Sequence, residues 1–422
     1  MSSTMTIRMY NVGFGDSFLL LLPGKKTILV DAGFHSQGKG AFTGNDLAKQ
    51  IAADAEAHSG EPRIDVVIAT HRHQDHVFAF NSAEWKKLDI GEVWMPWVED
   101  RDNPDANKLW KKQQGFAMRL AEAAPSFGLS PEDNAELDFL LWNAGIDITN
   151  LAAEAELAAW SNQGALETLH DGFRHRDRLD PRFLPESNVF PETFESSVIT
   201  GMKVHVLGPP RDPDEIEELD PANDDETYKA LMLRAAGVLA QAVAAPFSEQ
   251  WRVPETDAGP QLAAKDLKRL KGLAHSADAL LAAKAVDDMI NSTSLVLVLE
   301  IGDARLLLPG DAEWGTWKRI LANNKARSLL RGATFFKVGH HGSHNATSKT
   351  LVEKVLPREI PAMVSTQEGS GNYRNNIPLE DLLKALGEHD ISYARSDKGD
   401  EVLPPGFVAE ADAKWIDIEI AC

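Results

Sequence analysis

The sequence predicts a layered α/β fold whose strand ends gather around one site. A strand at Thr27–Val30, a stretch with helical spacing of its apolar residues and a second strand at Val66 form a crossover of the length that such a fold needs. Apolar runs of strand length end at Ile68, Leu308 and Val338, and histidine or aspartate follows each one closely. Because strand exits can gather several ligands around one point, this pattern indicates a metal site.

Composition limits the classes of function. The chain has 422 residues, enough for a large core, and its 43 basic and 64 acidic residues give a formal charge of −21. That balance argues against a broad basic surface for duplex DNA. A pair of metal ions is locally cationic, however, so a small anionic substrate or a nucleic-acid end remains compatible with the sequence.

Cysteine usage and hydropathy add two expectations. The only cysteine is Cys422, so any metal must be held by histidine and carboxylate rather than by thiolates. No apolar run approaches the roughly 20 residues that span a bilayer, and the first residues lack a signal-peptide pattern. We therefore expect no membrane contact and a cytoplasmic location.

Residues 1–97 are expected to form the first half of the domain. Thr6–Leu22 predicts two short strands around a Gly-x-Gly turn that ends at Asp16, a pattern that usually marks only a hairpin. The next strand ends at Asp31, whose simplest role is to cap a turn. Asn45 is a plausible N-cap for the crossover helix, and Ile90–Met95 predicts the strand that follows Val66.

The segment from Thr70 to His76 carries the strongest chemical signal. His71 and His73 alternate in an extended segment, so their side chains can point the same way and share one metal. Asp75 and His76 follow as the chain turns and are free to face a second metal. The alternative is a polar surface turn after a core strand, but four potential ligands in six residues have few structural uses.

Two mainly helical insertions are predicted. In residues 98–199, helical spacing covers Lys108–Ala124 and Asp133–Trp160. An arginine-rich segment at 173–178 could contact a phosphate or form a solvated loop. Residues 200–210 return as a strand, and residues 211–290 combine an acidic run with further helices. These insertions could bind a protein partner.

Residues 291–422 are expected to form the second half of the domain. Strands at Leu295–Glu300 and Ala304–Leu308 lead to Asp311, where a carboxylate can bridge two metals or cap the helix expected at 315–331. A third strand leads to adjacent histidines, His340 and His341. Each is a candidate ligand.

The motif at His71–His76 resembles the H-x-H-x-D-H element of the metallo-β-lactamase-fold hydrolases. Segments around Asp16, Asp311 and His340 resemble the D-V-G-x-G-D-[AS], L-x-x-G-D-A and K-V-x-H-H-G-S elements of the ComEC-type branch. Asp31 matches the L-[IV]-D-[AT]-G element of the whole superfamily. The resemblance implies an αββα sandwich with two metals at the edge between its halves.

The resemblance also implies roles for the candidate residues. It assigns one metal to His71, His73 and Asp311, and the other to Asp75, His76, Asp311 and His340. It makes Asp31 the hydrogen-bond partner of a ligand and His341 a substrate-facing or supporting group, although His340 and His341 could be exchanged. Asp16, Lys337 and Ser343 are placed near the metals, where Lys337 and Ser343 could orient an anion, although Lys337 could equally be a surface charge on its strand.

Two positions depart from the family pattern. Asn291 stands where many members place a third histidine, and an amide is a weaker ligand than imidazole. Manganese is therefore a candidate beside zinc for the two divalent ions. Ile377 stands where relatives often carry a histidine before a C-terminal helix.

The sequence therefore predicts a binuclear metal-dependent hydrolase. Metal coordination makes hydroxide available near neutral pH, Asp75 orients the water, and Asp75 or His341 returns a proton to the product. A phosphodiester or other phosphoester is the favoured substrate, because the branch includes nucleases and phosphodiesterases. The alternatives are a lactone, thioester or amide substrate on the same site, and a metal-binding scaffold without turnover.

Overall fold

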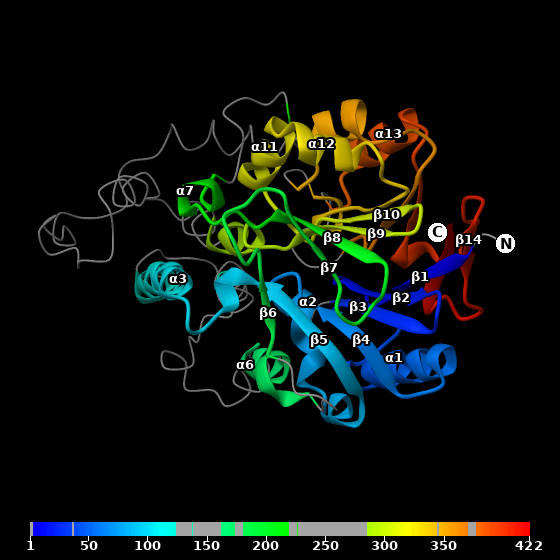
Figure 1. Ribbon diagram of the computed structural model, residues 1–422, viewed down its shortest axis with the longest axis horizontal. Coiled ribbons are helices and arrows are strands. Elements are labelled where there is room, and N and C mark those ends of the chain that lie inside the picture. Colours follow the sequence, from blue (N-terminus) through cyan, green and yellow to red (C-terminus); the bar gives the residue numbers. More distant parts are fainter. Residues whose placement is uncertain are drawn as a thin grey trace, which may run out of the picture.

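The computed structural model describes residues 3–35, 38–123, 137, 162–173, 180–218, 226, 285–343, 346–369 and 377–422. In these residues the strands form two sheets that lie face to face, with helices on both outer sides (Figure 1). This arrangement confirms the predicted α/β sandwich. Apart from residue 137, the predicted helices within 133–160 lie outside the described residues, as do the arginine-rich segment at 174–178 and most of 211–290.

The first sheet contains eight strands in the order β14-β15-β1-β2-β3-β4-β5-β6. Its strands are β1 (Thr4–Tyr10), β2 (Ser17–Leu22), β3 (Lys26–Ala32), β4 (Arg63–Ile68), β5 (Asp89–Pro96), β6 (Arg182–Leu184), β14 (Phe407–Ala409) and β15 (Trp415–Ala421). The central strands β3, β4 and β5 run parallel to one another. Their C-terminal ends therefore share one edge.

The second sheet contains seven strands in the order β13-β12-β11-β10-β9-β8-β7. Its strands are β7 (Glu192–Glu195), β8 (Met202–Gly208), β9 (Val296–Ile301), β10 (Ala304–Leu308), β11 (Phe335–Lys337), β12 (Pro361–Val364) and β13 (Ser392–Arg395). Strands β10 to β13 are parallel, so the exits of β10 and β11 also share an edge.

Helices cover the outer face of each sheet. The α-helices of five or more residues are α1 (Gly44–Ser59), α3 (Pro104–Ala123), α6 (Gln163–Glu167), α11 (Trp314–Ala322), α12 (Asn324–Leu330) and α13 (Glu380–Glu388). Of these, α3 packs against Trp97 and Val98 rather than on a sheet face. Shorter helical turns are α2 (Gln74–Val77), η1 (Phe78–Asn81), η2 (Ala83–Lys87), η3 (Trp97–Glu99), η5 (Thr168–Gly172), α7 (Pro213–Ile216), η7 (His340–Gly342), η8 (Leu351–Val355) and η10 (Ser396–Lys398). Residues 285–291 are also helical.

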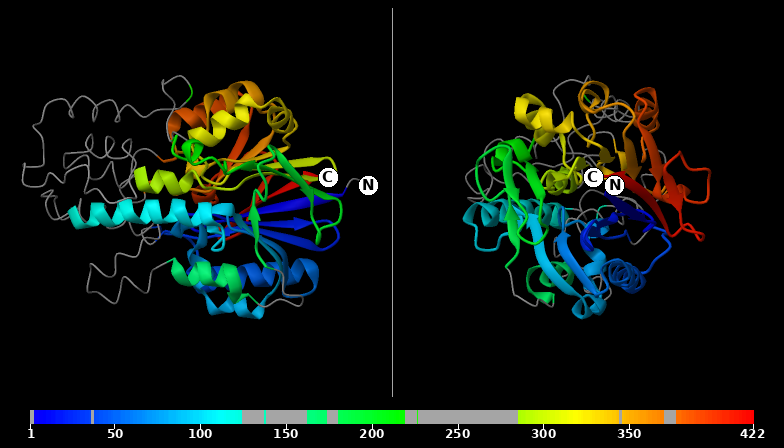
Figure 2. Two further views of the ribbon diagram at one scale, coloured as in Figure 1. Left: turned by 60° about the vertical axis from the view of Figure 1, so that its left-hand side comes forward. Right: turned by 45° about the vertical axis from the view of Figure 1, so that its right-hand side comes forward.

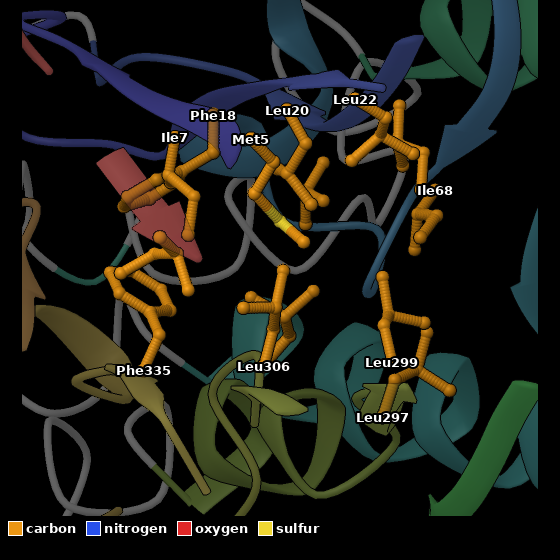
Figure 3. Close-up of a cluster of buried hydrophobic side chains, with 14 of the residues drawn as sticks. Met5, Ile7, Phe18, Leu20, Leu22, Ile68, Leu297, Leu299, Leu306 and Phe335 are labelled. Carbon is orange, nitrogen blue, oxygen red and sulfur yellow. The ribbon is translucent and has the colours of Figure 1, made fainter. Parts of the chain in front are cut away.

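The main core fills the space between the sheets. Met5, Ile7 and Leu20 project from the first sheet toward Leu306 and Phe335 of the second (Figure 3). Because successive side chains of a strand point to opposite faces, the alternate residues of β4 pack against α1 instead. A strand buried on both faces explains why the run at 66–68 is continuously apolar.

The structure differs from the sequence prediction at two helices. Helix α1 is capped by Thr43 rather than Asn45, because the Thr43 side chain accepts a hydrogen bond from the Asp46 backbone N–H. The helix expected at 315–331 is interrupted at Asn323, whose side chain caps α12. Both corrections follow from local polar side chains that compete for helix N-termini.

Residues 98–199, predicted as a helical insertion, also contain strands. β6 pairs with β5 at the edge of the first sheet, and β7 pairs with β8 at the edge of the second. The segment predicted as mainly helical thus extends both sheets. These strands are only three and four residues long, too short for a clear alternating pattern in the sequence.

Candidate metal centre

The histidine-rich loop begins where β4 ends at the edge of the first sheet. Nε2 of His71 and Nδ1 of His73 lie 3.0 Å apart, and both rings are buried. The alternation expected from an extended segment is therefore present. The chain then turns into α2, which brings Asp75 and His76 back toward the same point.

Asp311 reaches this loop from the second sheet. It follows Gly310, whose positive φ of 54° allows the sharp turn after β10. The Ser294 hydroxyl accepts a hydrogen bond from the Asp311 backbone N–H at 3.1 Å, which fixes the start of the turn. Asp311 Oδ2 lies 3.1 Å from Nε2 of His76. Asp311, which follows a strand of the second sheet, thus contacts the loop that follows a strand of the first sheet.

The two adjacent histidines after β11 take different places. His341 Nε2 lies 3.0 Å from Asp75 Oδ2 and 3.8 Å from Asp311 Oδ2. His340 instead lies beside Glu313 and Asn291, each with a nitrogen-to-partner distance of 3.4 Å. The structure therefore places His341 among the candidate ligands and His340 at their margin, the exchange that the sequence left open.

Left-handed backbone explains this placement. His340 and His341 have φ values of 46° and 53°, a backbone conformation that residues other than glycine rarely adopt. Ser365 supports the turn, because its carbonyl oxygen lies 2.9 Å from Nδ1 of His341. Strained backbone that surrounding contacts hold in place is typical of functional sites.

The candidate ligands converge on His76. Within the described part of the chain, residues able to hold a metal form three groups, each with ligand atoms within 4.8 Å of one another. These groups are His71, His76 and Asp311; Asp75, His76 and His341; and Asp16, Asp31 and His76. All their members are buried, and Asp75 Oδ1 makes no hydrogen bond.

This donor set fits a divalent metal ion. A buried carboxylate oxygen without a hydrogen-bond donor is costly unless a cation satisfies it. Imidazole and carboxylate without thiolate suit zinc, and they also suit manganese. His71, Asp75, His76, Asp311 and His341 are the residues that would hold such ions, and His73 lies beside His71.

Asp31 lies directly behind the ligand loop. Its carboxylate accepts hydrogen bonds from the backbone N–H and the hydroxyl of Thr70, both at 2.7 Å, and contacts Nδ1 of His76 at 2.8 Å. A carboxylate in that position fixes the ring orientation of a ligating histidine. Asp31 thus contacts His76, one of the candidate ligands, from the side opposite to Asp311 Oδ2.

Lys337 balances negative charge under the site. Its ammonium group contacts Asp16 and lies 3.6 Å from Asp311 Oδ1. Burial would lower the pKa of Lys337, but the carboxylates of Asp16 and Asp311 raise it above its ordinary value. Lys337 and Asp16 thus form a buried ion pair beside Asp311.

The same charges shift the pKa values of the candidate ligands. Burial opposes ionisation of Asp311, but His76 and Lys337 hold its pKa well below the usual range. Burial would lower the pKa of His76, yet Asp311 and Asp31 raise it well above 6.5. The pKa of His341 is also raised against the effect of burial, chiefly by its hydrogen bond to Asp75.

Burial dominates at two other histidines. It lowers the pKa of His71, aided by repulsion from His76 and His73, and it lowers the pKa of His35 to about 4. His71 is therefore neutral at physiological pH, the state that metal coordination requires.

The remaining predicted residues line the margin. Asn291 is fully buried and reaches His340, while Ser343 is buried directly after η7. Asp287 is a buried residue near the ligands that the sequence did not reveal; its Oδ1 lies 3.2 Å from Nε2 of His73. An acidic residue in a helical stretch gives no sequence signal that separates it from a solvated charge.

Comparisons with known proteins cover the first half of this site. Residues 10–105 match the model of the metallo-beta-lactamase superfamily. That segment contains the whole histidine-rich loop. Members of this superfamily are mostly metal-dependent hydrolases. Among the described residues, no helix has both the length and the hydropathy that crossing a membrane requires.

One curated relative is similar over part of the chain. ComE operon protein 3 of Bacillus subtilis (strain 168) is 32% identical over 111 residues, which make up 26% of this chain. The similar region covers only 13% of that protein. The likeness therefore concerns a segment rather than a whole protein.

Proposed function

We propose that the protein is a binuclear metal-dependent hydrolase that cleaves a phosphoester, with a phosphodiester favoured. The observation that carries the proposal is the convergence of buried histidines and carboxylates from both sheets on His76, with Asp311 between the two halves. Such a site has no evident structural purpose, since buried like charges and unsatisfied oxygens cost stability.

The ligand set that fits best uses His341 in place of His340. His71, His73 and Asp311 would hold one ion, and Asp75, His76, His341 and Asp311 would hold the other. When bound, two divalent ions lower the pKa of a water molecule and stabilise charge on a phosphoryl group. In-line displacement at phosphorus suits such a pair, which favours the phosphoester over a lactone, thioester or amide.

The residues of the chain supply orientation and proton transfer. Oδ1 of the buried Asp75 makes no hydrogen bond, so this oxygen would be available to hold an ion and to orient the water that the ion activates. His340 lies at the margin with its side chain 13% exposed, beside Asn291. We assign to His340 the substrate-facing role that the sequence gave to His341.

The substrate is expected to be a small anion or a nucleic-acid end. The net charge of −21 disfavours a long contact with a polyanion, whereas the site itself is locally cationic once metals bind. The insertions remain candidates for binding a protein partner.

Metal content and turnover test the proposal together. Purified protein is analysed for bound metal, reconstituted with zinc or manganese, and assayed with bis(p-nitrophenyl) phosphate, with a lactone and a thioester as comparison substrates. Two metals per chain and phosphodiester turnover that disappears in His73→Ala are expected. Metal with turnover of only the comparison substrates contradicts the phosphoester, and bound metal without turnover of any substrate leaves the scaffold alternative. The absence of bound metal contradicts the proposed site.

A further inference from the structure

The ring nitrogens of His73 contact two different groups. Nδ1 lies 3.0 Å from Nε2 of His71, whereas Nε2 lies 3.2 Å from Oδ1 of Asp287. The side chains of His73 and Asp287 are only 3% and 7% exposed. One nitrogen thus faces the neighbouring candidate ligand, and the other faces a buried carboxylate.

In the other candidate histidines, Nδ1 points away from the site and contacts a neighbouring polar group. Nδ1 of His71 contacts the Thr70 hydroxyl at 3.1 Å, and Nδ1 of His76 contacts Asp31 at 2.8 Å. Nδ1 of His341 contacts the Ser365 carbonyl oxygen at 2.9 Å. In each of these rings Nε2 is left to face the site. His73 is reversed, with Nδ1 toward the site.

That reversal requires a particular tautomer. A neutral imidazole carries one proton, and the nitrogen that binds a metal must be the one without it. Nδ1 of His73 can be a ligand only if Nε2 carries the proton, and the negative charge of Asp287, whose Oδ1 lies 3.2 Å from Nε2, favours a proton on that nitrogen. We infer that Asp287 is a positioning residue that holds His73 in the Nε2–H form and presents Nδ1 to a divalent metal ion.

The backbone around Asp287 holds it in place for this role. Asp287 lies in the helical residues 285–291, which lead directly into β9. The Leu295 backbone N–H donates to the Thr70 carbonyl oxygen at 2.9 Å, so this connection is tied to the start of the histidine-rich loop. Asp287 lies outside the segment that matches the superfamily, 10–105.

The inference rests on the metal site proposed above, but not on the substrate. It is tested by titrating zinc into metal-free protein with a competing chromophoric chelator. Asp287→Ala should weaken zinc binding by roughly 10- to 100-fold, the usual effect of removing the partner of a ligating histidine. Asp287→Asn keeps an acceptor oxygen and should lose less. The asparagine variant also provides the test if Asp287→Ala folds poorly.

Asp288→Ala is the matched control, because Asp288 is the neighbouring residue and similarly buried, at 8% against 5% exposed. It should bind zinc as the parent protein does. Long-range proton–nitrogen NMR of ring-labelled histidine, assigned with His73→Gln, should show the proton of His73 on Nε2 in the zinc-loaded protein.

The outcomes separate this inference from the proposed function. Zinc binding without turnover in the parent protein removes the hydrolase proposal and leaves the role of Asp287 intact. Equal weakening in the Asp287 and Asp288 alanine variants, a proton on Nδ1 of His73, or no zinc binding by the parent protein overturns the inference.

Discussion

The two ends of the site are supported by different parts of the molecule. At one end, Asp31 on β3 supports His76, and Thr70 on the adjoining loop binds the same carboxylate. At the other end, Asp287 supports His73 from helical residues 285–291. The Asp31 end is built within one sheet, whereas the Asp287 end depends on a segment that joins much later in the sequence. Loss of support from within the sheet should lower both metal binding and the stability of the fold. Loss of support from residues 285–291 should lower metal binding without an equal loss of stability.

Asp311 joins both ends, so its replacement should have the largest effect. Asp311→Asn keeps the shape but removes the charge that faces His76 and Lys337. We expect loss of bound metal and a fall in kcat/KM of more than about 100-fold, beyond what supporting partners usually contribute. Metal analysis and steady-state kinetics measure both effects. Glu300→Gln, a partly exposed carboxylate paired with Arg305, is the control and should retain metal.

Asp31→Ala tests the coupling at the core end. It removes the acceptor of the Thr70 backbone N–H and the carboxylate nearest to His76, and breaking a buried ionic pair typically costs about 3–5 kcal/mol. We expect a loss of that size in the free energy of unfolding of the metal-free protein, measured by urea denaturation. Asp287→Ala should lose much less stability. Equal losses of unfolding free energy in the Asp31 and Asp287 variants would contradict the proposed difference between the two ends of the site.

Replacing His340 and His341 one at a time tests which of the two adjacent histidines holds metal. His341→Ala removes a group that contacts both Asp75 and Asp311, so bound metal should fall and turnover should drop by roughly 100-fold. His340→Ala should retain metal and lose about tenfold in turnover, the lower range for a group that acts in proton transfer. Metal loss in the His340 variant with retention in the His341 variant would reverse the assignment.

The pH dependence of zinc binding, which reflects the release of protons from the ligands, should be the smallest of these effects. His76 and His341 have raised pKa values in the metal-free protein, so they hold protons that metal binding must displace. Zinc affinity should therefore rise with pH until both raised pKa values are passed. Calorimetry in buffers of different ionisation enthalpy measures the number of protons released. No release near pH 7 would contradict the raised pKa values.

The stability of the metal-free protein should depend on pH in the opposite sense. A raised pKa in the folded state means that folding favours the protonated ring, so the stabilisation is complete below the unfolded pKa of about 6.5. It is lost as pH rises through the raised pKa values. Urea denaturation over this range, with and without zinc, should give slopes of opposite sign.

Local patterns in the sequence predict most of the ligand loop and the sandwich. His71 to His76 are close in sequence, and their strand is apolar on both faces, so periodicity and spacing are sufficient there. The choice between His340 and His341 depends on left-handed backbone at both residues, which composition does not indicate. Asp287 and Ser365 reach the site only through tertiary contacts. The edge strands β6 and β7 were missed because strands of three or four residues give too short a pattern.

The pairing of β1 with β15 has a consequence for how the chain assembles. Ser3 donates a hydrogen bond to the carbonyl oxygen of Cys422, a separation of 419 positions, and Figure 2 shows the two marked ends side by side. Pairing between such distant segments carries a large loop-closure cost and slows folding. During synthesis β1 must therefore wait with one edge unpaired until β15 emerges. This makes the first strand the point where a chaperone, or an aggregating neighbour, has the longest opportunity to bind.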